Sequence, residues 1–144
     1  MRVQTAADLT PFFLRRSWHM TKTEKRRKAT GVPQQVERAV RAAEDKKAID
    51  LTVLDLRRAA GFTDFFVICS GSNPRQVRAI ADAVLESLEH DGAKPAHVEG
   101  YDRSEWILLD YFDFIVHVFA PETRMFYALE RLWGSAERVE VSPA

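Results

Sequence analysis

The stretch "FFVICSGSNPRQVRAIAD", residues 65–82, joins a buried strand to an amphipathic helix. Its first five residues are continuously apolar and rich in Phe, Val and Ile, which is typical of a central strand covered on both faces. Asn73 can cap the helix that follows, and Pro74 suits the first helical position, where a missing N–H costs no hydrogen bond. This strand–turn–helix unit predicts an α/β fold.

The turn Ser70-Gly71-Ser72 raises the question of a phosphate site. Backbone N–H groups at a helix start can bind an anion, but a strand-to-helix turn can also need a glycine for its shape alone. The turn has neither the lysine nor the spacing of a P-loop, and it lacks the further glycines of a dinucleotide fingerprint. A nucleotide-binding loop therefore stays open only as an alternative.

A nucleotidyltransferase would combine such a Gly-Ser turn with two carboxylates one residue apart that hold Mg²⁺. The acidic pair here, Asp110 and Asp113, is three residues apart and straddles a turn. The four histidines are scattered, and Cys69 lies in an apolar strand. We therefore expect no catalytic residue, no metal and no cofactor, with a nucleotidyltransferase-like enzyme that uses the Gly71 loop as the alternative hypothesis.

Apolar periodicity extends the fold on both sides of this unit. The final helix starts at Pro121, ends at Gly134, and carries Met125, Leu129 and Leu132 on one side. The expected helices are 34–47, 74–91 and 121–133, and the expected strands are 49–56, 64–70, 96–99, 105–111 and 114–120. This order predicts a mixed β-sheet of about five strands flanked by helices.

Charge and composition divide the chain. Residues 1–50 carry 12 Lys and Arg against 6 Asp and Glu, whereas residues 51–144 carry 9 against 15. We expect a flexible basic N-terminal extension over 1–33, one folded domain over 34–134 and a loose tail over 135–144. No apolar run approaches the roughly 20 residues of a membrane span. The acidic domain also argues against direct, specific nucleic-acid binding.

The extension contains Phe12, Phe13 and Leu14, too short an apolar core for a secretory signal. Its arginines and scarcity of acids are compatible with an organelle transit peptide. Alternatively, the natural start is Met20 and the first residues are an upstream addition. We favour the second interpretation and expect a bacterial cytoplasm.

The segment "VEGYDRSEWILLDYFDF", residues 98–114, holds five acidic residues, one base and the aromatic residues Tyr101, Trp106 and Tyr111. Aromatic anchors among acids suit the binding of a basic protein. The same pattern also fits an ordinary β-hairpin with Trp106 in its core. Composition does not choose between these two interpretations.

Three motifs together resemble one family. "TDFFVICSGSNPRQVRAIAD", "VEGYDRSEWILLDY" and "VHVFAPETRMFYALERLW" are similar, in order and spacing, to the ribosomal silencing factor (Iojap) family from about residue 36 to residue 133. The resemblance implies a nucleotidyltransferase-like fold without catalytic carboxylates, and no enzymatic activity. It implies binding to the large ribosomal subunit through the basic ribosomal protein fourteen (uL14), a steric block of small-subunit association, and repression of translation under nutrient limitation. It also implies a homodimer.

By position, the resemblance places the partner-binding surface on one segment, with further candidates in the final helix. One departure is Phe112, which stands where the family usually has glycine. A positive φ is costly for phenylalanine, so the geometry of the turn between Asp110 and Asp113 stays open. The implied contact residues are Trp106, Ile107, Leu109, Asp110, Tyr111 and Asp113, and the secondary candidates are Arg124, Tyr127 and Glu130.

Overall fold

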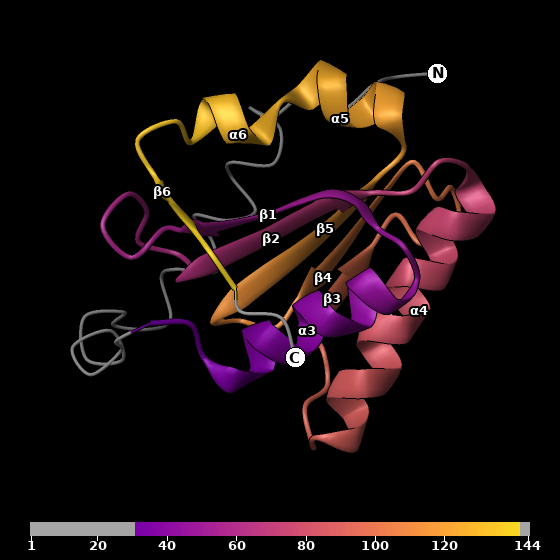
Figure 1. The fold of residues 1–144 in the computed structure, drawn as a ribbon, viewed down its shortest axis with the longest axis horizontal. Helices are drawn as coiled ribbons and strands as arrows, with labels where there is room; N and C mark the ends of the chain where they lie inside the picture. Colours follow the sequence, from indigo (N-terminus) through magenta and orange to yellow (C-terminus); the bar gives the residue numbers. More distant parts are fainter. Residues whose placement is uncertain (1–30, 142–144) are drawn as a thin grey trace.

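The computed structural model describes residues 31–141, which form a three-layer α/β domain around one six-stranded mixed sheet (Figure 1). Residues 1–30 of the expected basic extension therefore lie outside the described residues. The sheet order is β3-β4-β5-β2-β1-β6. The strands are β1 Ile49–Asp55, β2 Phe65–Ser70, β3 His97–Glu99, β4 Trp106–Asp110, β5 Phe114–Phe119 and β6 Glu137–Val139.

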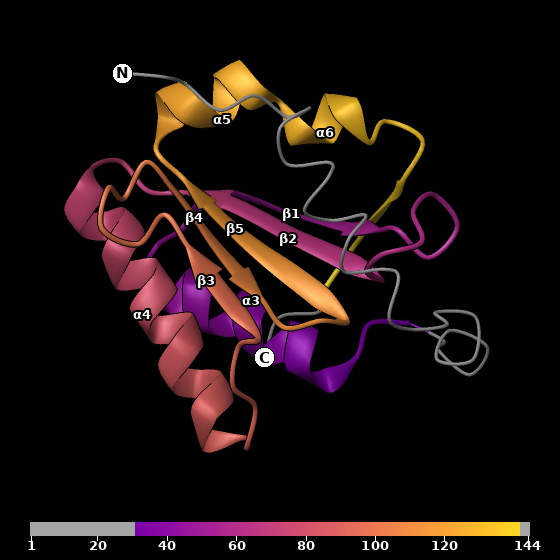
Figure 2. The same ribbon diagram turned by 180° about the vertical axis from the view of Figure 1, so that it is seen from behind.

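The helices cover opposite faces of this sheet, as Figure 1 and the reverse view in Figure 2 show. Helices α3 (Gln34–Asp45) and α4 (Pro74–His90) lie on one face, and the shorter α5 (Pro121–Tyr127) and α6 (Leu129–Leu132) lie on the other. Each face has its own apolar core. None of the helices within residues 31–141 is long and apolar enough to cross a membrane.

Strand β2 confirms the prediction of a central strand, because all six of its residues are buried. It pairs parallel to β5 and antiparallel to β1, which makes the sheet mixed. Side chains alternate between the two faces of a strand. Val67 therefore packs in the α3–α4 core while Phe66 and Ile68 pack in the α5–α6 core.

The sheet has one strand more than the five expected. Glu137–Val139 forms β6 and pairs with β1, Val53 lying opposite Val139, so this part of the expected loose tail is an edge strand. Three residues carry too little periodicity to reveal a strand. The backbone hydrogen bonds that β1 offers at the sheet edge determine the strand instead.

The final helix breaks where the sequence predicted continuity. Ala128 adopts a left-handed conformation (φ 49°) between α5 and α6. The break redirects the chain, so Met125 and Leu132 do not share a buried side with Leu129. Leu129 is buried, whereas Met125 is 81% exposed and Leu132 is 51% exposed.

Candidate partner-binding surface

The predicted contact residues of β4 do not lie on one surface, because they alternate between the two faces of a covered strand. Ile107, Leu109 and Tyr111 point towards α3 and α4 and belong to that core. Ile107 and Leu109 have no exposed surface, and Tyr111 is 8% exposed. In this conformation these three side chains stabilise the fold and have almost no surface with which to contact a partner.

Asp110 and Asp113 flank the turn between β4 and β5. Asp110 is buried, and its Oδ1 accepts a hydrogen bond of 2.8 Å from the backbone N–H of Phe112. Asp113 is only partly buried, and its backbone N–H donates to the carbonyl of Tyr111 at 2.9 Å. Phe112 adopts a positive φ of 77° between them. The turn thus keeps the backbone conformation that glycine favours, and Asp110 caps it.

Trp106 is half-buried and points to the opposite face, beneath α5. Its ring centroid lies 4.5 Å from that of Tyr127 and 4.8 Å from that of Phe119. The indole Nε1 donates to Nδ1 of His117 at 3.0 Å. Trp106 is therefore compatible both with a core residue of the β-hairpin and with a partner-binding anchor, since it packs against the core and still reaches the surface.

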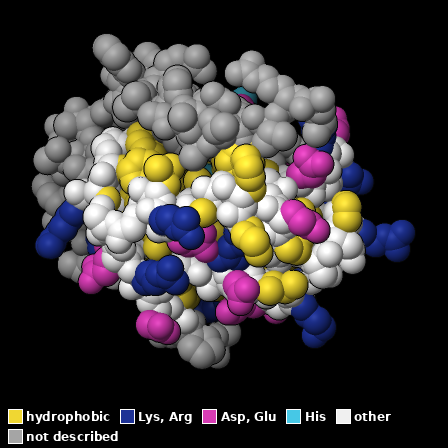
Figure 3. Space-filling model, turned by 90° about the horizontal axis from the view of Figure 1, so that it is seen from above, with side chains coloured by type: hydrophobic (Ala, Val, Ile, Leu, Met, Phe, Trp, Pro, Cys, Tyr) yellow, Lys and Arg dark blue, Asp and Glu magenta, His cyan; other side chains and the backbone are white. Residues whose placement is uncertain are grey.

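The largest exposed apolar side chains near it come from α5 and α6. We define the α5–α6 face as Met125, Phe126 and Leu132, which are 81%, 63% and 51% exposed. Figure 3 looks onto this side of the molecule, where apolar side chains lie among acidic and basic ones. Sequence reasoning missed this face because it assigned Met125 and Leu132 to one side of an unbroken helix together with Leu129.

The secondary candidates Arg124, Glu130 and Tyr127 have structural contacts. Arg124 lies 2.6 Å from the Glu130 carboxylate and donates to the Ser70 hydroxyl at 3.1 Å. Burial alone would raise the pKa of Glu130, but the hydrogen bond and charge of Arg124 outweigh it and lower that pKa. These contacts hold α5 and α6 against the ends of β1 and β2.

Side chains at the start of α4 accept the hydrogen bonds that the Gly71 turn could offer to a ligand. Gln76 Oε1 accepts from both the backbone N–H and the hydroxyl of Ser72, at 2.6 and 2.7 Å, and Asn73 Oδ1 accepts from the N–H of Gln76 at 2.9 Å. A Cβ on Gly71 would stand 2.7 Å from the backbone nitrogen of Val77. The glycine thus permits close packing of α4, and two donors that could bind phosphate are already engaged.

The acidic pair lies at the other end of the sheet from this turn. Asp110 pairs with Ile115 near the start of β5, whereas Ser70 pairs with Phe119 at its end. A four-residue difference along a strand is about 13 Å.

No group of three His, Cys, Asp or Glu side chains suited to a metal is found within residues 31–141. Burial raises the pKa of Cys69 to about 12, which makes its thiol a poor nucleophile.

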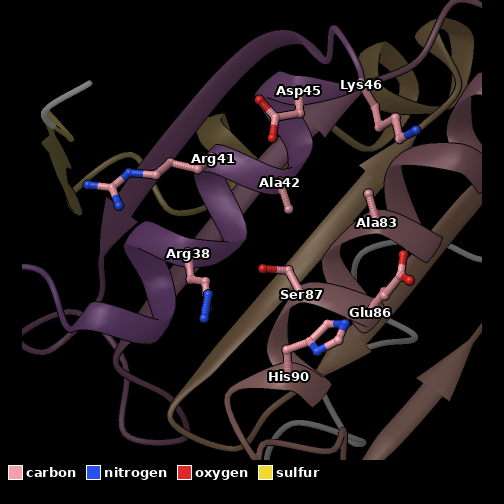
Figure 4. Close-up of a pocket in the computed structure, with 9 residues that line it drawn as sticks. All are labelled: Arg38, Arg41, Ala42, Asp45, Lys46, Ala83, Glu86, Ser87 and His90. Carbon is pink, nitrogen blue, oxygen red and sulfur yellow. The ribbon is translucent and has the colours of Figure 1, made fainter. Parts of the chain in front are cut away.

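A hollow of about 540 Å³ lies between α3 and α4, on the other side of the sheet from α5 and α6. Figure 4 shows Arg38 on α3 and Ser87 and His90 on α4 on either side of this hollow, whereas the Arg41 side chain points away from α4. Basic and acidic side chains line it together, so its charge selects no single class of ligand. The α5–α6 face and Trp106 form the stronger candidate site.

The comparisons with known proteins agree on one family. The family model "Ribosomal silencing factor during starvation" matches residues 29–144. The ribosomal silencing factor of Halalkalibacterium halodurans is 40% identical over 103 residues, covering 72% of this chain and 88% of that protein. The Bacillus subtilis relative is 39% identical over 98 residues, covering 68% and 83%. A chloroplastic Iojap protein of Zea mays is 37% identical over 101 residues, covering 70% of this chain and 44% of that longer protein.

Solved structures support the same assignment. A crystal structure from Bacillus halodurans has a TM-score of 0.66 and 37% identity, and it covers 73% of this chain and 95% of that one. A structure from Chromobacterium violaceum has a TM-score of 0.70 and 30% identity, and it covers 80% and 95%. Because the family model matches residues 29–144, which is more than half of the sequence, this chain belongs to the ribosomal silencing factor family.

Proposed function

We propose that this protein binds the large ribosomal subunit through the basic ribosomal protein uL14 and thereby blocks association with the small subunit. The contact is made by the α5–α6 face together with the exposed edge of Trp106. The block is steric, so the protein acts without catalysis, and it represses translation when nutrients are limiting. The bacterial relatives favour a cytoplasmic location.

The exposed apolar side chains of α5 and α6 carry this proposal. Met125 and Phe126 are adjacent on a helix and are 81% and 63% exposed, which is unusual for large apolar residues. Met and aromatic residues are enriched in the cores of protein interfaces, and tryptophan is a frequent energetic anchor. A surface with these residues at its centre suits a protein partner better than it suits a nucleic acid.

Charge supports a basic partner. Residues 51–144 carry 15 Asp and Glu against 9 Lys and Arg. An acidic domain is attracted to a basic protein and is repelled by phosphate, which favours a ribosomal protein over ribosomal RNA as the direct contact. The apolar side chains then supply affinity after this charge attraction brings the partners together.

The test is co-sedimentation of the purified chain with separated large subunits. Phe126→Ala and Met125→Ser change exposed side chains, so we expect folding to be unaffected and affinity to fall at least about tenfold for a central contact. Val98→Thr is the matched control, because Val98 is also exposed, at 37%, but pairs with Leu109 on the other face of the sheet. Unchanged binding by both α5 variants would contradict the proposed face.

The anti-association step needs its own readout. Small subunits are added to large subunits with and without the protein, and joined ribosomes are measured by gradient sedimentation. We expect fewer joined ribosomes with the wild type and a normal number with Phe126→Ala. Binding without any loss of joined ribosomes would contradict the steric block.

The family resemblance also implies a homodimer, and we include it in the proposal. The α5–α6 face would suit a second copy as well as a ribosomal partner. If the second copy binds the α5–α6 face, sedimentation equilibrium should show weaker self-association for Phe126→Ala than for the wild type. Equal self-association of the two proteins would place the dimer contact elsewhere.

A further inference from the structure

His117 is a polar side chain enclosed in the apolar core under α5. It lies in β5 with no exposed surface. Its ring centroid is 4.5 Å from that of Phe66 and 6.1 Å from that of Phe119, and Trp106 lies on its outer side. Burial lowers the pKa of His117 to about 3, so the imidazole is neutral at physiological pH. An apolar residue would fill this position without the cost of burying a polar group.

The hydrogen bond to Trp106 assigns the tautomer of this imidazole. An indole N–H can only donate, so Nδ1 of His117 must accept at 3.0 Å and the proton must lie on Nε2. Nε2 has no hydrogen-bond partner among the described residues. The Phe66 ring stands edge-to-face with the imidazole at 78°, an arrangement in which an N–H can point at a π-face.

Trp106 needs such a constraint because it begins its strand. Strand β3 pairs with Leu108–Asp110 only and leaves Trp106 without a neighbouring strand on that side. The backbone of Trp106 is held by its pairing with Phe119 and by close approach to Gly100, where a Cβ would overlap the Trp106 carbonyl. Neither contact restricts the indole. Its orientation depends on the ring contacts with Phe119 and Tyr127 and on the hydrogen bond to His117.

We propose that His117 is a positioning residue, which fixes the indole of Trp106 in the orientation that the ribosomal partner contacts. The proposal rests on the proposed function, in which Trp106 is part of the contact surface. His117 does not touch the partner, since it is fully buried. It acts by accepting the indole N–H, so that the exposed edge of Trp106 is set before binding and less conformational freedom is lost on association.

Two substitutions of similar size separate positioning from packing. His117→Asn keeps an acceptor near the position of Nδ1, whereas His117→Leu removes the acceptor and leaves an apolar side chain. A residue that served only the core would tolerate leucine better, because leucine buries no polar group. If His117 positions Trp106, His117→Asn should instead keep the indole N–H better protected than His117→Leu does. It should also bind the large ribosomal subunit more tightly than His117→Leu.

The first readout is hydrogen exchange of the tryptophan indole N–H groups by nuclear magnetic resonance, with Trp106→Phe to identify the Trp106 signal. We expect protection of that signal in the wild type, faster exchange in His117→Leu and restored protection in His117→Asn. An unchanged Trp106 signal in His117→Leu overturns the proposal, whatever the binding result.

The second readout is affinity for the large ribosomal subunit. We expect His117→Leu to bind roughly tenfold more weakly than the wild type, as for the loss of one oriented contact, and His117→Asn to bind more tightly than His117→Leu. A freed indole with unchanged affinity would overturn the role of His117 in binding. If the wild type fails to bind the large subunit, the proposed function itself is contradicted. The exchange experiment would still decide whether His117 orients Trp106.

Discussion

The Arg124 guanidinium lies 2.6 Å from the Glu130 carboxylate, across the point where Ala128 breaks the chain between α5 and α6. The same guanidinium donates to the Ser70 hydroxyl and to the backbone carbonyl of Ile49. One side chain thus joins both short helices to the ends of two strands. The shape of the α5–α6 face depends on this ion pair.

Glu130→Gln should therefore lower the free energy of unfolding by about 1–2 kcal/mol, since a charged hydrogen bond in a partly exposed site is lost. Because Arg124 lowers the pKa of Glu130, this stabilisation is present above the ordinary glutamate pKa and is lost as pH falls through the lower folded value. Urea unfolding at pH 7 and in acid measures both effects. Glu140→Gln, an exposed control, should change little. A difference from the wild type that persists at low pH would contradict the ion-pair account.

Phe112 carries backbone strain that a substitution can reveal. Its φ of 77° is unfavourable for any residue with a Cβ and free for glycine. Phe112→Gly and Phe112→Ala both remove the ring, so their difference isolates the backbone. We expect the glycine variant to be more stable by about 1 kcal/mol, the reverse of the usual order. A more stable alanine variant in thermal unfolding would show that the turn relaxes without strain.

Gly71→Ala tests whether the Gly71 turn is a packing feature. A Cβ there meets the backbone of Val77 at 2.7 Å, so we expect a loss of about 1–3 kcal/mol in stability. Gly61→Ala is the matched control, because nothing lies within 4 Å of the position of its Cβ. Titration of the wild type with a nucleoside triphosphate and Mg²⁺ should leave the unfolding temperature unchanged. Stabilisation by millimolar nucleotide would revive the enzyme hypothesis.

His117 should make the protein sensitive to acid. The imidazole is surrounded by the rings of Phe66, Trp106 and Phe119, and its folded pKa is about 3 against an unfolded value of about 6.5. Between these values the unfolded chain binds one more proton than the folded chain, so stability falls by up to about 1.4 kcal/mol for each pH unit lowered. His117→Asn removes this titration, and its stability should fall less steeply from pH 6.5 to pH 4. Parallel pH profiles for the two proteins would place the acid sensitivity elsewhere.

Local chemistry made much of the fold predictable. The side chain of Asn73 caps α4, Pro74 occupies its first position, and Gly92 follows its end with a φ of 81°. The continuous apolar run of β2 correctly indicated a strand with two covered faces. Each of these features depends on neighbours in the sequence, which is why the sequence alone was enough.

Features that depend on distant contacts were missed. Strand β6 exists because β1 offers it backbone partners, and its three residues carry no periodic pattern. The burial of two predicted contact residues has a related cause, since β4 is covered on both faces and Ile107 and Leu109 belong to the core. The exposed residues Met125 and Phe126 became visible only with the break at Ala128.

The two outer strands of the sheet, β3 and β6, are each three residues long. An edge strand templates the addition of further chains through its unpaired backbone groups, and a short edge offers few of them. Short outer strands therefore limit edge-to-edge addition between copies of this domain, in which β2 and β5 are buried along their whole length.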